Sequence, residues 1–185
     1  MRRKAIVIVL LFACSSIAVA QPRGRDTLIS LNPFGPLYGL YAVTVEQRVA
    51  SDLTAVIAPA YYNLHYSAFR TAAPDGYRAW HAGARIGVNY YPGMRAPAGF
   101  FAGGHLRAGY LSLRDGQGSA EGIFVSPSLV MGFRVFAGRI GIAPRLRLGY
   151  AVPFFDYSGI DAGNQMLYGP TALEWDLGVG LAFAF

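Results

Sequence analysis

One His-x-Ser pair among three histidines is the feature of this sequence whose residue types could carry catalysis. His65 and Ser67 flank Tyr66, and in such a pair an imidazole can act as the base for a serine nucleophile in acyl transfer. The base must itself be oriented by a third group, and no glutamate follows the pair until Glu121. Because the third group of such a catalytic site is missing near the pair, we expect no enzyme activity.

A metal site would have to combine His65, His81 and His105. These histidines fall on three successive expected strands at different depths, although His65 and His81 could meet across a hairpin. No cysteine and no nearby carboxylate completes a ligand set of the kind that transition metals need. We therefore expect no bound metal and no cofactor.

The elements that position these residues are strands, because apolar residues recur with a period of two and not with the spacing of an amphipathic helix. The apolar runs are about 10 to 14 residues long, which exceeds the usual strand of a soluble protein and suits a tilted membrane crossing. We expect eight strands, at residues 26–32, 36–49, 53–66, 78–91, 98–112, 122–135, 140–152 and 171–185, with the first turn through 33–35.

The connections between the expected strands alternate between short and long. Short turns fall near residues 50–52, 92–94 and 136–138, and long polar segments fall at 67–77, 114–121 and 154–170. Short turns on one side and long loops on the other are typical of outer-membrane barrels. The pattern predicts an all-β fold, an eight-stranded antiparallel transmembrane β-barrel with up-and-down connections. A soluble sandwich or a lipocalin-like carrier is the alternative.

Aromatic residues gather near both ends of the expected strands. Two such belts are what the two lipid-water interfaces of a membrane select. The belt near the short turns comprises Tyr90, Tyr91, Phe100, Phe101, Phe133, Phe136, Phe183 and Phe185, and the belt near the long loops comprises Tyr62, Tyr66, Tyr77, Trp80, Tyr110, Tyr150 and Phe154.

The N-terminal segment has the layout of a secretory signal peptide. Arg2, Arg3 and Lys4 precede an apolar stretch that ends at an Ala-Val-Ala pattern before Gln21. We expect a signal peptide over residues 1–20 and a barrel domain over 21–185, exported to the outer membrane of a Gram-negative-type bacterium. Lipidation of Cys14 is an alternative. Cleavage before Gln21 would remove Cys14, the single cysteine of the chain, and with it any thiol chemistry.

The charge balance argues against a nucleic-acid partner. Three of the 16 basic residues lie in the signal segment, which leaves 13 basic residues against 10 acidic ones. The remaining cations are all arginine and are spread along the chain, whereas a nucleic-acid footprint is a clustered basic patch.

On the polar face of the strands, ionisable residues would point into the barrel. The expected ionic cluster comprises Glu46, Arg48, Arg85, Arg107, Arg134, Arg145, Arg147, Glu174 and Asp176. An eight-stranded barrel is barely wide enough for its own side chains, so we expect these residues to pair into a plug, with Arg48 close to Glu174 and Asp176. A narrow arginine-lined path for anions or small solutes is the alternative.

The chain resembles the small outer-membrane β-barrel proteins grouped as DUF3575-like. The resemblance rests on "LISLNPFGPLYGLYAVTVEQRVASDLTA", on "GVNYYP" and on the terminal "GVGLAFAF". It implies an eight-stranded barrel and no established activity. The terminal residues Phe183 and Phe185 look like the signal by which barrel-assembly machinery recognises its clients.

These observations predict a structural or surface-interaction role. The expected partners are outer-membrane lipid, lipopolysaccharide and the barrel-assembly machinery, and we expect a monomer. The second alternative is a lipid A-modifying enzyme, since a family of outer-membrane deacylases uses a His-x-Ser pair like that of His65 and Ser67.

Overall fold

The computed structural model describes residues 26–63, 78–114, 118–154 and 173–185. Several predictions fall on other parts of the chain: the signal peptide over 1–20, the alternative at Cys14, and the His65 and Ser67 pair. The side chain of Glu174 also lies outside the described residues, although its backbone belongs to the last strand.

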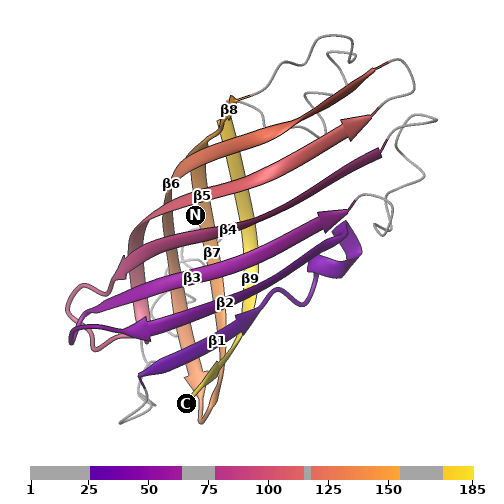
Figure 1. The fold of residues 1–185 in the computed structure, drawn as a ribbon. Helices are drawn as coiled ribbons and strands as arrows, with labels where there is room; N and C mark the ends of the chain where they lie inside the picture. The colour runs from indigo at the N-terminus through magenta and orange to yellow at the C-terminus, as the bar shows by residue number, and fades with distance from the viewer. Residues whose placement is uncertain (1–25, 64–77, 115–117, 155–172) are drawn as a thin grey trace, which may run out of the picture.

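The described residues form one closed antiparallel sheet (Figure 1). The strands are β1 (Thr27–Leu31), β2 (Leu40–Arg48), β3 (Leu53–Asn63), β4 (Arg78–Tyr90), β5 (Gly99–Arg114), β6 (Ser119–Ala137), β7 (Ile140–Tyr150), β8 (Val152–Phe154) and β9 (Leu173–Ala184). β7 and β8 act as one strand of the wall, since both pair with β6 on either side of Ala151. The predicted eight-stranded up-and-down barrel is confirmed.

Closure of the barrel depends on β1, which lies between β2 and β9. Leu28 is opposite Glu46 on one side and opposite Ala184 on the other. The pairing of β5 with β6 joins the remaining edges. With β7 and β8 taken as one strand, each of the eight strands has two neighbours, so the described residues leave no long unpaired edge, which is how closed barrels satisfy the backbone.

Two strand boundaries differ from the prediction. Residues 36–39, expected as strand, lie mostly in the 3-10 helix η1 (Gly35–Tyr38). Pro36 lacks a backbone N–H, and Gly39 has a φ of 73° and donates its N–H to the carbonyl oxygen of Pro36 at 3.0 Å. The strand expected at 140–152 is interrupted at Ala151, two residues before Pro153, which cannot donate to the ladder.

The two ends of the barrel differ in their connections. Residues 49–52, 91–98 and 138–139 connect strands at one end, here called the turn end, where β9 also finishes. The opposite end, here called the loop end, carries η1, the ends of β3, β5 and β8, and the starts of β4, β6 and β9 (Figure 1). Within the described part of the chain, no helix has the length and hydropathy needed to cross a bilayer.

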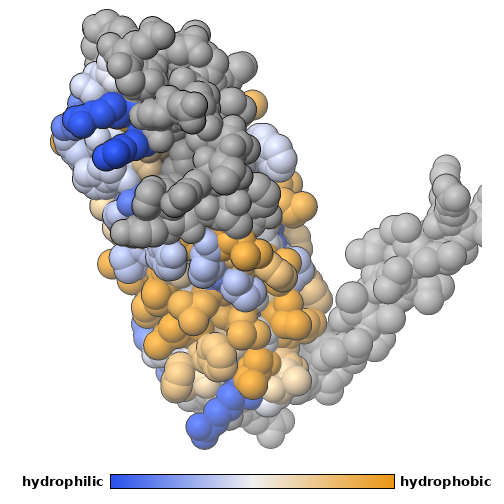
Figure 2. Space-filling view, turned by 90° about the vertical axis from the view of Figure 1, so that its right-hand side faces the viewer, coloured by the Kyte–Doolittle hydropathy of each residue, from blue (hydrophilic) through white to orange (hydrophobic). Residues whose placement is uncertain are grey.

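The outer surface of the barrel is apolar. Leu173, Trp175 and Leu177 of β9 are 68%, 71% and 74% exposed, and Ile57, Ile86 and Leu129 on other strands are also exposed. Figure 2 shows one face of the barrel, with a hydrophobic band and hydrophilic groups beyond it at both ends. The predicted alternation of apolar and polar faces is confirmed, with the apolar face outward.

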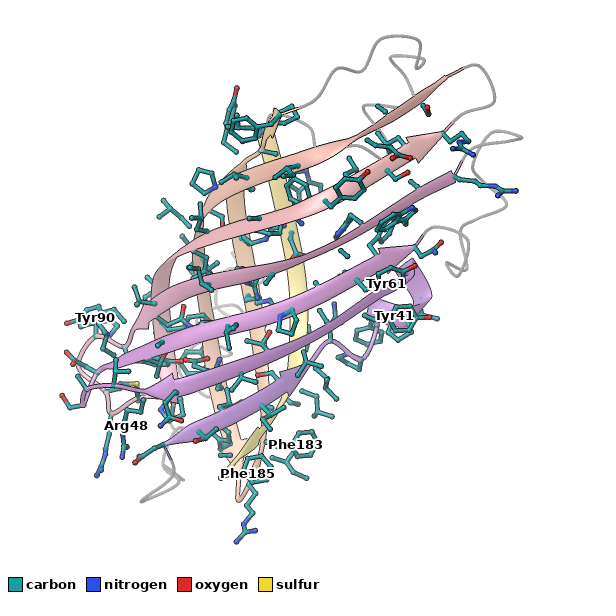
Figure 3. All side chains as sticks on the ribbon, viewed as in Figure 1. Tyr41, Arg48, Tyr61, Tyr90, Phe183 and Phe185 are labelled. Atoms are coloured by element: carbon teal, nitrogen blue, oxygen red, sulfur yellow. The ribbon has the colours of Figure 1, made fainter. Side chains whose placement is uncertain are left out.

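Tyr66 and Tyr77 of the predicted belts lie outside the described residues, and most of the belt residues that the structure describes face outward. Tyr90, Phe100 and Phe185 are exposed at the turn end, and Trp80, Tyr110, Tyr150 and Phe154 are exposed toward the loop end. Tyr41 and Tyr61 add two outward rings on the loop-end half of β2 and β3 (Figure 3). The rings therefore gather toward the two ends of the apolar band.

Four predicted belt residues point into the barrel instead. Tyr91, Phe101 and Phe136 are buried, and Tyr62 stacks on the inward-facing His81 with ring centroids 5.2 Å apart. The reason is the pleat, because successive side chains of a strand point to opposite faces. Tyr90 and Tyr91 are neighbours, as are Phe100 and Phe101, so only one ring of each pair can face outward. The belt prediction was wrong for the inward rings.

Candidate functional site: the polar interior

The first interior site is a buried ion pair near the turn end. Glu46 is the third residue from the end of β2, and Arg134 is the fourth from the end of β6. Arg134 Nη2 lies 2.8 Å from Glu46 Oε2, and the two side chains are 5% and 1% exposed. Alternation places both on the inward face. The pair therefore joins two walls of the barrel from inside.

Neutral donors complete the hydrogen bonding of the Glu46 carboxylate. Its Oε1 accepts hydrogen bonds from the hydroxyls of Thr54 and Tyr91 and, at 3.3 Å, from Asn89 Nδ2. Asn89 Oδ1 in turn lies 2.9 Å from His105 Nε2. A buried carboxylate requires such a complete set of partners. We call Glu46, Arg134, Thr54, Tyr91 and Asn89 the plug cluster.

The segment from Tyr91 to Ala98 packs this cluster into the turn end. Arg134 Nη1 donates to the Tyr91 hydroxyl at 2.7 Å and to the carbonyl oxygen of Pro97 at 3.1 Å. The guanidinium also lies over the ring of Phe101, at 5.2 Å from its centroid. Burial raises the pKa of the Tyr91 phenol, and the Glu46 carboxylate raises it further against the opposing effect of Arg134. The phenol therefore stays protonated and donates to Glu46.

Arg48 takes a different place from the predicted one. Its guanidinium forms an ion pair with Asp26 at the turn end and donates to the carbonyl oxygen of Ala96 at 3.5 Å. Figure 3 shows Arg48 at this end of the barrel. Asp176 lies nine residues before Phe185 on β9, and its partner is Arg147. The predicted closeness of Arg48 to Asp176 was wrong. The order of the strands fixes which walls are close to each other, but not how far along the barrel axis each residue lies.

The second interior site is a group of arginines further from the turn end. Arg85, Arg107, Arg145 and Arg147 line a cavity of about 70 Å³ with His81, Phe124 and Asp176. The Arg147 Nε and Asp176 Oδ2 atoms lie 3.8 Å apart, and the Arg107 guanidinium lies 4.8 Å from the ring centroid of Phe124. We call these four arginines with Asp176 the arginine cluster.

The structure thus divides the expected cluster, of which it describes eight of the nine side chains, all but that of Glu174. Glu46 and Arg134 form the plug, and Arg48 lies at the turn-end rim. Arg85, Arg107, Arg145, Arg147 and Asp176 lie together around the cavity. The expected cluster omitted Thr54, Asn89 and Tyr91. Inward alternation is the signal that would have found them, since all three are buried on the face that carries the charges.

The two described histidines lie apart. His81 stacks on Tyr62 and meets Phe124 edge-on, whereas His105 contacts Asn89 beside the plug. In the β4–β5 ladder His81 is opposite Leu111 and His105 is opposite Gly87, six positions along the strands. Among the described residues, no group of three or more His, Cys, Asp and Glu side chains is placed to hold a metal ion.

The C-terminal strand ends in a hydrogen-bonded position. The Phe185 N–H donates to the carbonyl oxygen of Thr27 at 2.9 Å, and its carbonyl oxygen accepts from the Asp26 N–H at 3.1 Å. The Phe185 side chain is 61% exposed, and Phe183 is opposite Ile29 and Ile140. The last residues therefore help to close the barrel through β1.

No protein-family model matches this sequence. A search of curated proteins found no match either.

Proposed function

We propose that the protein is an outer-membrane β-barrel of a Gram-negative-type bacterium, with a structural or surface-interaction role and no enzyme activity. The observation that carries the proposal is the outward apolar band (Figure 2), which lies between two groups of exposed aromatic residues. Such a surface is costly in water and favourable in lipid. The signal-like N-terminal segment supports export.

The interior supports a role without conduction. The plug cluster and the inward rings of Tyr91 and Phe101 fill the turn end with side chains that are at most 5% exposed around the ion pair. A path for solutes would have to pass through this end. The role then belongs to the outer surface and the loops, with lipopolysaccharide and outer-membrane lipid as partners and with the barrel-assembly machinery acting on the last strand. We also propose a monomer and membership of the DUF3575-like group.

The proposal is tested by cell fractionation and by gel mobility. Outer-membrane barrels resist SDS until they are heated, so we expect the protein in the outer-membrane fraction and a change in mobility on boiling. A protein that fractionates with the periplasm and shows no change on boiling would contradict the proposal. In that case the apolar band would be a binding surface for another protein or a ligand.

A narrow anion pathway is the second candidate function, because four arginines line the internal cavity. It predicts current steps in a planar bilayer with the unaltered protein, and these should diminish when Arg145 or Arg147 is replaced by glutamate. We expect no such steps from the unaltered protein, because the plug cluster fills the turn end of the barrel.

A further inference from the structure

We propose that the arginine cluster is a binding site for one small oxyanion of the phosphate or sulfate class, enclosed within the barrel. The site is an interior feature, so the proposal goes beyond the proposed surface role and does not depend on it. It rests on three properties of the cluster: its charge, its unpartnered donors and its cavity.

The first property is an excess of positive charge. Arg85 lines the same cavity as Arg107, Arg145, Arg147 and the Asp176 carboxylate. Among the side chains that the structure describes around this cavity, four guanidinium groups thus face one carboxylate. Arginine does not lose its proton in proteins, so the excess charge cannot be relieved by neutralisation.

The other interior carboxylate of the described chain is already used. Glu46 accepts from Arg134 and from the neutral donors of the plug cluster. A buried charge without a counter-charge costs several kcal/mol by order of magnitude. Among the described side chains that line the cavity, Asp176 is the one carboxylate, and a bound anion would offset the remaining positive charge.

The second property is a pair of donors without acceptors. Within the described part of the chain, the buried Nε atoms of Arg85 and Arg145 have no hydrogen-bond partner, and neither does Nδ1 of His81. These residues come from β4 and β7, three strands apart around the wall. Donors that converge from different walls match a polyatomic anion with several acceptor oxygens, and the guanidinium fork matches phosphate geometry.

The third property is a space of matching size. The cavity of about 70 Å³ is larger than a single water molecule needs and can hold a small polyatomic anion. The plug cluster lies closer to the turn end than this cavity does, because Glu46 and Asn89 are within three residues of their strand ends and Arg85 is the sixth from the end of β4. The anion is therefore held at a blind end instead of passing through.

The test is a titration of the folded barrel, in a phosphate-free detergent, with inorganic phosphate at constant ionic strength. Calorimetry or phosphorus NMR line widths should show saturable binding at one site, and sulfate should compete. Glycerol phosphate should compete poorly, which distinguishes a free oxyanion from a lipid headgroup. Equal competition by glycerol phosphate would overturn the enclosed site.

Variants that remove a positive charge and a variant that removes the negative charge test whether binding depends on this cluster. Arg85→Gln and Arg145→Gln should each weaken phosphate binding about tenfold or more, since each removes a charged donor. Arg114→Gln is the matched control, because Arg114 is exposed at the end of β5, and it should bind as the unaltered protein does. Asp176→Asn should bind phosphate more tightly, because it removes the competing carboxylate.

Two outcomes would overturn the proposal: the unaltered barrel shows no saturable binding, or Arg145→Gln binds phosphate as tightly as the unaltered barrel. If the arginine variants do not fold, as judged by gel mobility, Asp176→Asn decides. Tighter binding supports the site, and unchanged or weaker binding overturns it.

Discussion

Glu46 and Arg134 form an ion pair across the full width of the barrel. In the closed order of strands, β2 and β6 are four strands apart in either direction, so the two residues stand on opposite walls. Arg134 Nη2 lies 2.8 Å from Glu46 Oε2, and the two residues are 88 apart in sequence. The ion pair links the two opposite walls of the barrel at the turn end.

Glu46→Gln should destabilise the barrel strongly. The substitution leaves the Arg134 charge buried without its counter-charge, which typically costs about 3–5 kcal/mol. The free energy of unfolding, measured by urea titration in lipid vesicles with tryptophan fluorescence, should fall by that order. Glu121→Gln is the matched control, because Glu121 is an exposed carboxylate of β6, and it should change stability by about 0.5 kcal/mol or less.

The combined variant Glu46→Gln with Arg134→Met should recover part of that loss. It removes both charges together, and replacing both members of a buried pair with groups of similar volume is often close to neutral. The two single substitutions should therefore be non-additive, by about 0.5–3 kcal/mol. Additive losses would mean that the two residues stabilise the barrel independently and that their ion pair is not the relevant contact.

Leu177→Arg separates a membrane barrel from a water-exposed one. Leu177 is 74% exposed near the middle of β9. In water a substitution at such a position is nearly neutral, whereas an arginine near the bilayer midplane costs about 2–4 kcal/mol and one near the interface about 0–1 kcal/mol. We expect a large loss for Leu177→Arg and a small one for Leu173→Arg in the same unfolding measurement. Equal and small losses would argue against a lipid-facing strand.

The strand count and the two faces of the wall could be predicted from the sequence because each depends on local alternation. Trp175 and Asp176 are adjacent, and a period of two is sufficient to place one outside and the other inside. Alternation predicted seven strands, and the first strand was added because bacterial barrels of this class have an even number of strands. These properties need no knowledge of which distant residue meets which.

The partners inside the barrel could not be predicted in the same way. Arg134 meets Glu46 because strand tilt and register bring their heights together, and neither quantity can be read from the alternation. The same limit explains Arg48, which was expected near Asp176 and instead pairs with Asp26. Tyr91 was placed in a belt because aromatic type was considered without the alternation that turns it inward.

Gly83→Ala should destabilise the wall of the barrel. A Cβ added at Gly83 would meet the backbone of the neighbouring strand, at the carbonyl oxygen of Ala108 and at 2.7 Å from the Cα of Gly109. The two strands would have to move apart, at a cost of about 1–3 kcal/mol. Gly104→Ala is the control, since a Cβ there has nothing within 4 Å. Equal stability of the two variants would contradict the close approach of β4 and β5.

Tyr91→Ala should convert a closed barrel into a conducting one. The Tyr91 side chain is fully buried at the turn end, and its ring centroid lies 5.6 Å from that of Phe101. Its hydroxyl donates a hydrogen bond to Glu46 and accepts one from Arg134. Its removal opens the end that the plug cluster fills. In a planar bilayer we expect no current steps from the unaltered protein and small steps from the variant. These steps should favour anions, because arginines line the interior beyond the plug.

Tyr90→Ala is the matched control for this experiment. Tyr90 is the adjacent residue with the same side chain, but it is 48% exposed on the outer face of the barrel. Its loss should weaken anchoring at the lipid-water interface and leave the current at the level of the unaltered protein. If both variants conduct alike, the current reflects general loosening of the barrel. If the unaltered protein already conducts, the plug does not close the turn end and the anion pathway becomes the better account of the function.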